Sequence, residues 1–203
     1  MTNNQFSNYS DKDWYDNVFR YISKNYYYQE ERFMQTFRYV ELDKRNSDTF
    51  SMEYSSILSD VGRIFSSTME ELYKQIDPKP VEKPNIGHFR LLLLDHVTQI
   101  YGQLVYVNPL KHTGKYIIFP YSAFKNSNGT PEWWDAYNKV KHGDIHNYEF
   151  GNLKNTLTAL AGILLLFLNI KGRNKSKLFD DYGLGRADEE DEEFKTKLLF
   201  SNP

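Results

Sequence analysis

The densest group of side chains able to do chemistry lies in residues 133–142, WWDAYNKVKH. His142 titrates near neutral pH, so it can remove or supply a proton in catalysis. Lys141 can hold a phosphate, Asn138 can orient a hydroxyl or a phosphate oxygen, and Trp134 can stack on a base. This combination of residue types predicts a site for RNA chemistry.

The helix expected over residues 131–142 sorts these side chains onto separate faces at 100° per residue. The face expected in the core holds Trp133, Ala136, Tyr137 and Val140. The adjacent face holds Trp134, Asn138, Lys141 and His142, whereas Asp135 and Lys139 point to solvent. An indole among amide and cationic groups is unusual for a purely solvated face. The pattern therefore predicts a groove or a subunit interface, and Asn138 and His142, at i and i+4, can contact one ligand atom or each other.

Other interpretations of the same residues stay open. Asn138 and His142 can simply cap the helix end or bond to a neighbouring helix, with no further role. His142 and His146 are also four residues apart, but no carboxylate cluster completes a metal site, so neither a metal nor a cofactor is expected. Glu53 and Asp60 lie seven residues apart at the edge of an apolar face, where they are either solvated or orient a histidine on a neighbouring helix.

The remaining helices follow from apolar spacing and from capping residues. The spacing of Trp14, Val18, Tyr21 and Ile22 predicts a first helix, and a second short one is expected over 27–40, where Arg32 and Arg38 are ordinary surface charges. Ser47, Asp48 and Thr49 are expected to cap a long helix that ends at Ile76, before Asp77-Pro78. Further helices are expected over 86–100 and 148–171, the latter ended by Gly172. For the helix that carries the site, Thr130 is the expected N-cap, Pro131 the first helical residue and Gly143 the stop.

Two short runs rich in β-branched and aromatic residues, 103–107 and 116–119, flank a turn that contains His112. They predict a small β-hairpin inserted in a mainly α fold. We expect one helical domain over residues 1–178 and an acidic, partly disordered tail over 179–203. The last residues, FKTKLLF, could fold back onto the body. Basic residues gather just before the tail, at Lys171, Arg173, Lys175 and Lys177.

The bulk composition excludes several classes of protein. The net charge of -2 over 203 residues excludes a polybasic nucleic-acid binder of the histone type, although a local basic site remains possible. Without cysteine there are neither disulfides nor thiolate-held zinc. No basic segment followed by an apolar run opens the chain, so a cytoplasmic protein is expected. The apolar stretch 157–170 is shorter than the roughly 20 residues of a membrane span and predicts a buried core helix.

Two stretches resemble bacterial members of the HEPN superfamily. These are residues 131–168, PEWWDAYNKVKHGDIHNYEFGNLKNTLTALAGILLLFL, and the earlier FRYVEL (37–42) with SMEYSSILSDVGRIF (51–65). HEPN domains are small helical bundles, usually dimeric, that occur in toxin–antitoxin and other defence systems. Many are metal-independent endoribonucleases whose motif is an Arg, often followed by a polar residue, with a His four to six residues after the Arg.

The resemblance implies a HEPN-like helical bundle that acts on RNA. The motif's polar residue falls on Asn138 and its His on His142, while Tyr137 stands where the motif has Arg. A second register uses Lys141 and His146. The implied catalytic group is then His142, Asn138 and Lys141, and the implied substrate contacts are Trp134, Tyr137, Lys139 and His146. The implied partners are RNA, a second copy of the chain and an antitoxin or other protein. The alternative is a non-catalytic module that binds RNA, a nucleotide or a protein.

Overall fold

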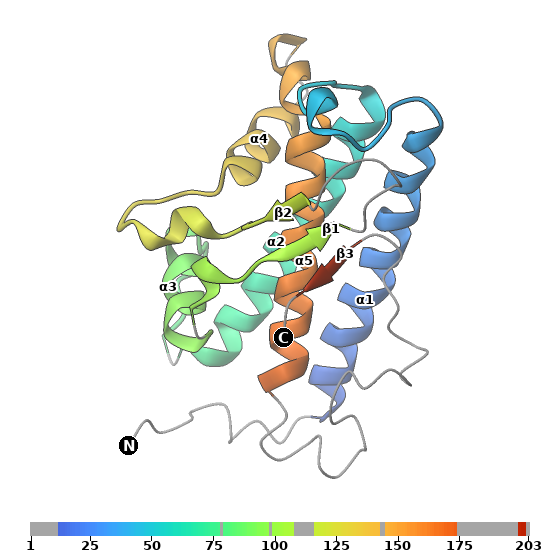
Figure 1. The fold of residues 1–203 in the computed structure, drawn as a ribbon. Coiled ribbons are helices and arrows are strands. Elements are labelled where there is room, and N and C mark those ends of the chain that lie inside the picture. Colours follow the sequence, from blue (N-terminus) through green and yellow to red (C-terminus); the bar gives the residue numbers. More distant parts are fainter. Residues whose placement is uncertain are drawn as a thin grey trace.

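The structure, a computed structural model, describes residues 12–77, 79–97, 99–107, 116–142, 145–173 and 199–201. Over these ranges the chain is mainly helical, with five α-helices and one small sheet (Figure 1). The helices are α1 (Lys12–Gln35), α2 (Met52–Ile76), α3 (Ile86–His96), α4 (Glu132–Val140) and α5 (Leu153–Arg173). The strands are β1 (Val105–Val107), β2 (Tyr116–Ile118) and β3 (Leu199–Ser201). The predicted mainly α class is confirmed.

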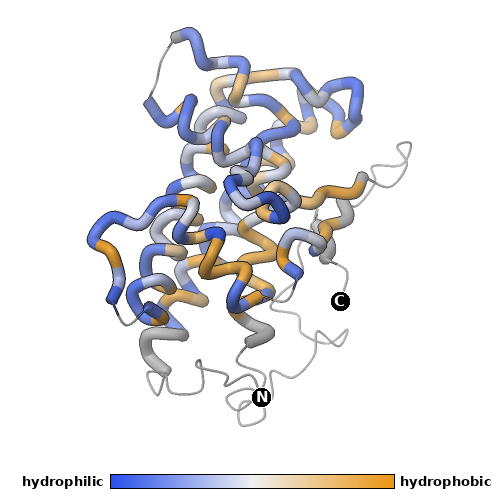
Figure 2. The backbone as a smooth tube through the Cα atoms, turned by 90° about the vertical axis from the view of Figure 1, so that its left-hand side faces the viewer, coloured by the Kyte–Doolittle hydropathy of each residue, from blue (hydrophilic) through white to orange (hydrophobic). Residues whose placement is uncertain are grey.

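Helix α5 forms the centre of the molecule and contacts α1, α2 and α4 (Figure 1). Its residues from Leu157 to Leu166 are apolar nearly all round and almost all buried, which is the pattern of a helix enclosed by others. The stretch Leu153–Ile170 is long and apolar enough to cross a membrane by length and composition, yet 78% of it is buried inside the structure. Along the trace, hydrophilic residues gather in the loops at the upper end of the molecule (Figure 2).

The first two predicted helices form one continuous helix, α1. Instead of stopping near Ile22 and restarting at Tyr27, α1 continues to Gln35, because no Gly or Pro interrupts it. Its buried face simply continues through Ile22, Tyr26 and Phe33.

The long second helix ends at Ile76 as predicted, but its N-cap was predicted too early. Ser51, and not Ser47, Asp48 or Thr49, caps α2, since its side chain accepts a hydrogen bond from the Tyr54 backbone N–H. The hydroxyl of Ser47 instead donates to the carbonyl of Lys44 in the preceding 3-10 turn η3 (Lys44–Asn46).

The other helix ends shift by a few residues. Helix α3 stops at His96, short of the predicted residue 100, and Gln99 then adopts a left-handed conformation with φ 49°. Helix α5 begins at Leu153, because residues 145–150 form the 3-10 helix η6 (Ile145–Phe150). It also continues through the predicted stop at Gly172 to Arg173.

The sheet has the order β2-β1-β3. Strands β1 and β2 pair antiparallel, with Val105 opposite Ile118, as expected for the predicted hairpin. The connection between them, including His112, lies outside the described residues. Strand β3 pairs antiparallel with the other edge of β1, with Tyr106 opposite Phe200, so the end of the chain does return to the body. Residues 174–198, which hold most of the predicted acidic tail, and the side chains of Lys171 and Arg173 lie outside the described part.

Candidate functional site

Helix α4, which carries most of the predicted site, begins one residue later than expected. Its N-cap is Pro131 rather than Thr130, and no side chain caps the helix. The backbone of Pro131 is extended, with ψ 135°, so this residue lies outside the helix although its ring suits a helix start. Its carbonyl accepts hydrogen bonds from the backbone N–H groups of Trp134 (2.9 Å) and Asp135 (3.2 Å).

More of the α4 surface is buried than its helical projection predicts, because α2 and α5 both pack against the helix. Trp133 is buried as expected, and its indole N–H donates to the Pro120 carbonyl at 3.0 Å. Trp134 is also buried, at 8% exposure, with its ring 5.3 Å from that of Phe65. The prediction that Trp134 lines an open groove or interface is therefore wrong, since α2 covers it within the chain.

Tyr137 is an anchor of α4 on α2. Its side chain is buried, and its ring lies directly on Gly62, where an added Cβ would overlap the ring. Burial raises the pKa of the Tyr137 hydroxyl, while the charge of Arg63 opposes that shift. Tyr137 thus holds α4 against α2.

The exposed side of α4 holds a lysine fixed by an amide. The Nζ of Lys141 donates to Oδ1 of Asn138 at 2.7 Å and lies 5.0 Å from the centre of the Tyr137 ring. The helix ends at Val140 with Lys141 as its C-cap, so His142 lies beyond the last turn. Asn138 accordingly bonds to Lys141, and no hydrogen bond joins it to His142 among the described residues.

The 3-10 helix η6 packs against α4 and carries one further predicted residue, His146. The Nζ of Lys139 lies 3.5 Å from the centre of the Phe150 ring, and the Asn147 side chain donates to the Lys139 carbonyl at 3.4 Å. His142 and His146 are both exposed. Asn138, Lys139, Lys141, His142 and His146 thus lie in the last turn of α4 or in the segment that follows it, and we call them the α4 basic surface. Gly143, the predicted helix stop, lies outside the described residues.

The two lysines of the α4 basic surface contact an amide and aromatic rings. Within the described ranges, neither Lys139 nor Lys141 forms an ion pair with a carboxylate. Both lysines lie at the C-terminal end of α4, where the helix dipole favours cations. Phosphate oxygens are among the anionic ligands that such exposed cations bind in water.

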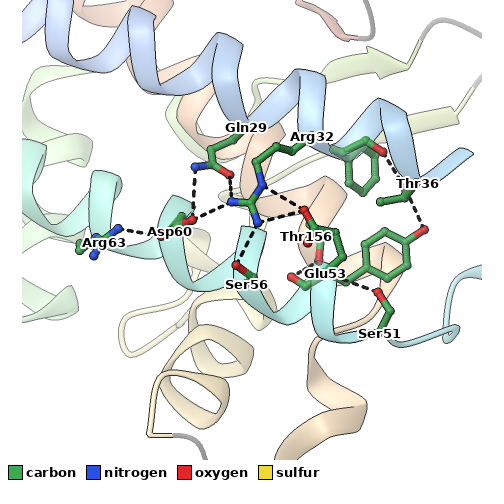
Figure 3. Close-up of polar contacts among 11 residues, drawn as sticks. Gln29, Arg32, Thr36, Ser51, Glu53, Ser56, Asp60, Arg63 and Thr156 are labelled. Atoms are coloured by element: carbon green, nitrogen blue, oxygen red, sulfur yellow. Dashed lines mark hydrogen bonds and ion pairs between the residues drawn. The ribbon is translucent and has the colours of Figure 1, made fainter.

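A second polar cluster lies between α1 and α2, centred on Arg32 (Figure 3). Its guanidinium forms ion pairs with Asp60 at 2.8 Å and Glu53 at 2.9 Å. It also donates to Gln29 at 3.0 Å and Ser56 at 2.9 Å. The Arg32 side chain is 19% exposed, so it is no ordinary surface charge. Both carboxylates are thus engaged by an arginine of α1, and no described contact links either of them to His142.

This cluster extends to a residue that sequence reasoning missed. The other oxygen of Asp60 accepts from Nη2 of Arg63 at 2.7 Å, as Figure 3 shows. Arg63 is 70% exposed and follows Gly62, the residue that supports Tyr137. It is therefore held beside the α4 basic surface. The spacing of Asp60 and Arg63, at i and i+3 on a helix, was the available signal.

Neither a metal site nor a match to known proteins adds to this geometry. Over the described residues, no three His, Asp or Glu side chains lie close enough together to hold a metal ion. Comparison with family models, with curated proteins and with solved structures gave no significant match.

Proposed function

We propose that this chain is an RNA-directed protein that binds RNA phosphates through the α4 basic surface. The observation that carries the proposal is the pair of lysines, Lys139 and Lys141, that have no carboxylate partner within the described ranges. A neutral or basic ligand would leave both charges uncompensated, whereas a phosphate backbone would replace their counterions. The resemblance to HEPN proteins supports RNA as the nucleic acid, a role in defence or a toxin–antitoxin system, and a homodimer.

Each residue has a distinct role in this proposal. Lys141 contacts a phosphate, and Asn138 limits its rotamers through the 2.7 Å hydrogen bond, so less side-chain entropy is lost on binding. Arg63 adds a planar guanidinium that can bind a phosphate through two hydrogen bonds. Trp134 and Tyr137 do not stack on bases and instead hold α4 in place from the core.

The test is a measurement of RNA affinity against salt concentration. The wild type should bind a labelled single-stranded RNA more weakly as salt rises. The double variant Lys139→Ala, Lys141→Ala should reduce the slope of log K against log salt by about 0.7 for each lost phosphate contact. Lys74→Ala, an exposed lysine on α2, serves as the matched control and should behave like the wild type. Absence of wild-type binding at low salt, or equal slopes for all variants, would contradict the proposal.

A second candidate function, metal-independent cleavage of RNA, is favoured by the two exposed histidines on the α4 basic surface. One histidine would remove the proton from a ribose 2′-hydroxyl, whose oxygen then bonds to the adjacent phosphorus. The bond from phosphorus to the 5′ oxygen breaks, and that oxygen takes a proton from the second histidine. Lys141 would offset charge on the phosphate. The products are a 2′,3′-cyclic phosphate and a 5′-hydroxyl.

Cleavage is tested with a labelled structured RNA in EDTA. We compare the wild type with His142→Ala and His146→Ala, and His88→Ala, on α3, is the control. Cyclic phosphate ends from the wild type alone would support a ribonuclease. If His142→Ala cleaves at the wild-type rate, the catalytic role of His142 is wrong. If no protein cleaves but RNA binding persists, the chain is a non-catalytic RNA-binding module.

A further inference from the structure

A groove with a volume of about 650 Å³ runs beside β2, on a part of the molecule separate from the α4 basic surface. Its floor contains the buried residues Pro120, Pro131 and Trp133. Lys44 of η3 contributes to its wall, as do Lys154 and Thr158 from the first turns of α5. This volume is typical of sites that enclose a ligand or a short segment of chain.

The groove follows the free edge of β2. Ile117, Ile118 and Phe119 all line it, although consecutive side chains in a strand point to opposite faces. Residues of both faces line one groove when it runs along the edge of the strand, where the backbone N–H and C=O groups are accessible. The sheet order β2-β1-β3 leaves this edge open, and no strand pairs with it in the described part of the chain.

The described residues of β2 carry no charged side chain, although the strand is only three residues long and Pro120 lies just beyond it. Proteins commonly place charged side chains on an exposed edge strand to prevent the addition of another strand. Here Ile117 and Phe119, two residues apart on one face, are each 44% exposed. An extended segment paired with β2 would cover both side chains with its own alternate residues.

The opposite edge of the same sheet shows how such a segment is accommodated. Strand β3, from residues 199–201, pairs with β1 although the two are nearly a hundred residues apart in sequence. The sheet is therefore completed on that side by a distant segment that adds as a strand. The geometry at β2 is open to the same kind of addition.

The charged residues that line the groove indicate which kind of peptide segment would bind there. Lys44 and Lys154 both line the groove, and Nζ of Lys154 donates to the two carboxylate oxygens of Glu132 at 2.8 and 2.7 Å. Glu132 is 70% exposed, so it forms a replaceable ion pair at the surface. An incoming carboxylate can take the place of Glu132 on Lys154.

We propose that this groove binds an extended acidic peptide segment of a partner protein, which pairs with β2 as a fourth strand. The backbone of β2 supplies the hydrogen bonds, Ile117 and Phe119 pack against apolar side chains of the peptide, and Lys154 binds one of its carboxylates. This is strand addition, a general mode of peptide recognition. It does not depend on whether the chain binds RNA.

The experiment is an NMR titration of the isotope-labelled full chain with a blocked peptide of about six alternating Glu and Val residues. The amide signals of Ile117, Ile118 and Phe119 should shift on binding. A matched Lys–Val peptide should bind at least about tenfold more weakly, because it faces lysines. A Glu–Val peptide with N-methyl groups on alternate residues should also bind weakly, because it cannot donate hydrogen bonds to the strand edge.

Two variants change the affinity in opposite directions. Lys154→Glu should weaken binding of the Glu–Val peptide, whereas Glu132→Gln should strengthen it by freeing Lys154. Lys74→Glu is the control for charge alone, and thermal unfolding of each variant checks that it folds. The proposal is overturned if the Glu–Val peptide shifts no β2 signal, if the Lys–Val or N-methyl peptide binds equally well, or if both variants weaken binding alike.

Discussion

At the scale of single residues, Lys141 is held by an amide and an aromatic ring rather than by a carboxylate. Asn138 fixes its ammonium, and Tyr137, buried on Gly62, lies beneath it. A lysine bound to a carboxylate must break an ion pair before it meets a phosphate. Lys141 keeps its charge available, which is why we assign it the first contact with RNA.

Arg63 should contribute to the same surface. Arg63→Ala should lower RNA affinity and reduce the salt dependence by about one phosphate contact, because Asp60 holds its guanidinium beside α4. The readout is the slope of RNA affinity against salt concentration. Arg20→Ala, an exposed arginine of α1, is the control. Equal loss in both variants would show that Arg63 acts only through net charge.

Arg32 should contribute to stability instead. Arg32→Ala leaves Asp60 and Glu53 without their shared partner, so the free energy of unfolding should fall by about 1–3 kcal/mol. Urea denaturation measures the change. Arg38→Ala, at an exposed position just after α1, should change stability by less than about 0.5 kcal/mol. Equal stability of the Arg32 variant and the wild type would show that the Arg32 ion pairs contribute no net stability.

Single-residue roles were the hardest to predict from sequence. The segment around α4 was identifiable from its unusual mixture of residue types, and its exposed lysines and histidines lie in the last turn of α4 or in the segment that follows it. Trp134 was predicted to line a groove because a helical projection treats one helix alone. It cannot show that α2 covers the face that holds Trp134. Arg32 was interpreted as an ordinary surface charge because its partners, Glu53 and Asp60, lie on another helix.

At the scale of elements, the junction of α2 and α4 is defined by a glycine. The absence of a side chain at Gly62 lets the Tyr137 ring lie against the α2 backbone. The position of α4, and with it the orientation of the α4 basic surface, therefore depends on one residue of another helix.

Gly62→Ala should destabilise the protein and displace α4. A methyl group at this position overlaps the Tyr137 ring, and overpacking of this kind costs about 1–3 kcal/mol. Gly102→Ala is the matched control, since nothing lies within 4 Å of the added Cβ. Thermal unfolding measures stability, and the near-UV circular dichroism of the tryptophans reports the shift of α4. Similar unfolding temperatures for both variants would contradict this account.

The turn η3 should respond to acid. Hydrogen bonds from the Arg45 side chain and backbone lower the pKa of Asp43 below its ordinary value. The stabilisation is complete above the ordinary pKa of about 3.9 and is lost as pH falls through the lower folded-state pKa. Asp43→Asn should therefore be less stable than the wild type at neutral pH, and the difference should vanish in strong acid. Unfolding temperatures across this range measure it, and a gap that stays constant would contradict it.

Elements were predictable where local signals agree with packing. The end of α2 at Ile76 follows from the proline two residues on, and the two hairpin strands follow from β-branched and aromatic runs. Helix starts were less predictable, since several capping residues lie in a row before α2 and only the fold selects Ser51. Strand β3 depends on a long-range pairing with β1, so its local sequence alone could not place it in the sheet.

At the scale of the whole molecule, the charge is distributed unevenly along the chain. The net charge is -2, yet the run DEEDEE at residues 188–193 contributes six negative charges. The rest of the chain is therefore basic on balance, which is consistent with a local surface for a polyanion.

Replacing these six residues by their amides should increase RNA affinity at low salt. The change removes long-range repulsion between the chain and the phosphate backbone, and the gain should disappear at high salt, where the Debye length is short. Affinity at two salt concentrations measures the effect. An RNA affinity that is unchanged at low salt would show that the acidic run does not influence the binding surface.

The central position of α5 has a consequence for how the protein is made. Its apolar residues complete the core for α1, α2 and α4, yet it follows all of them in the sequence. Until residues 153–170 have been synthesised, α1 and α2 can pack on each other, but the faces that they turn toward α5 remain uncovered. Contacts between α1 and α5 also join segments more than a hundred residues apart, which slows folding relative to helical proteins with local contacts.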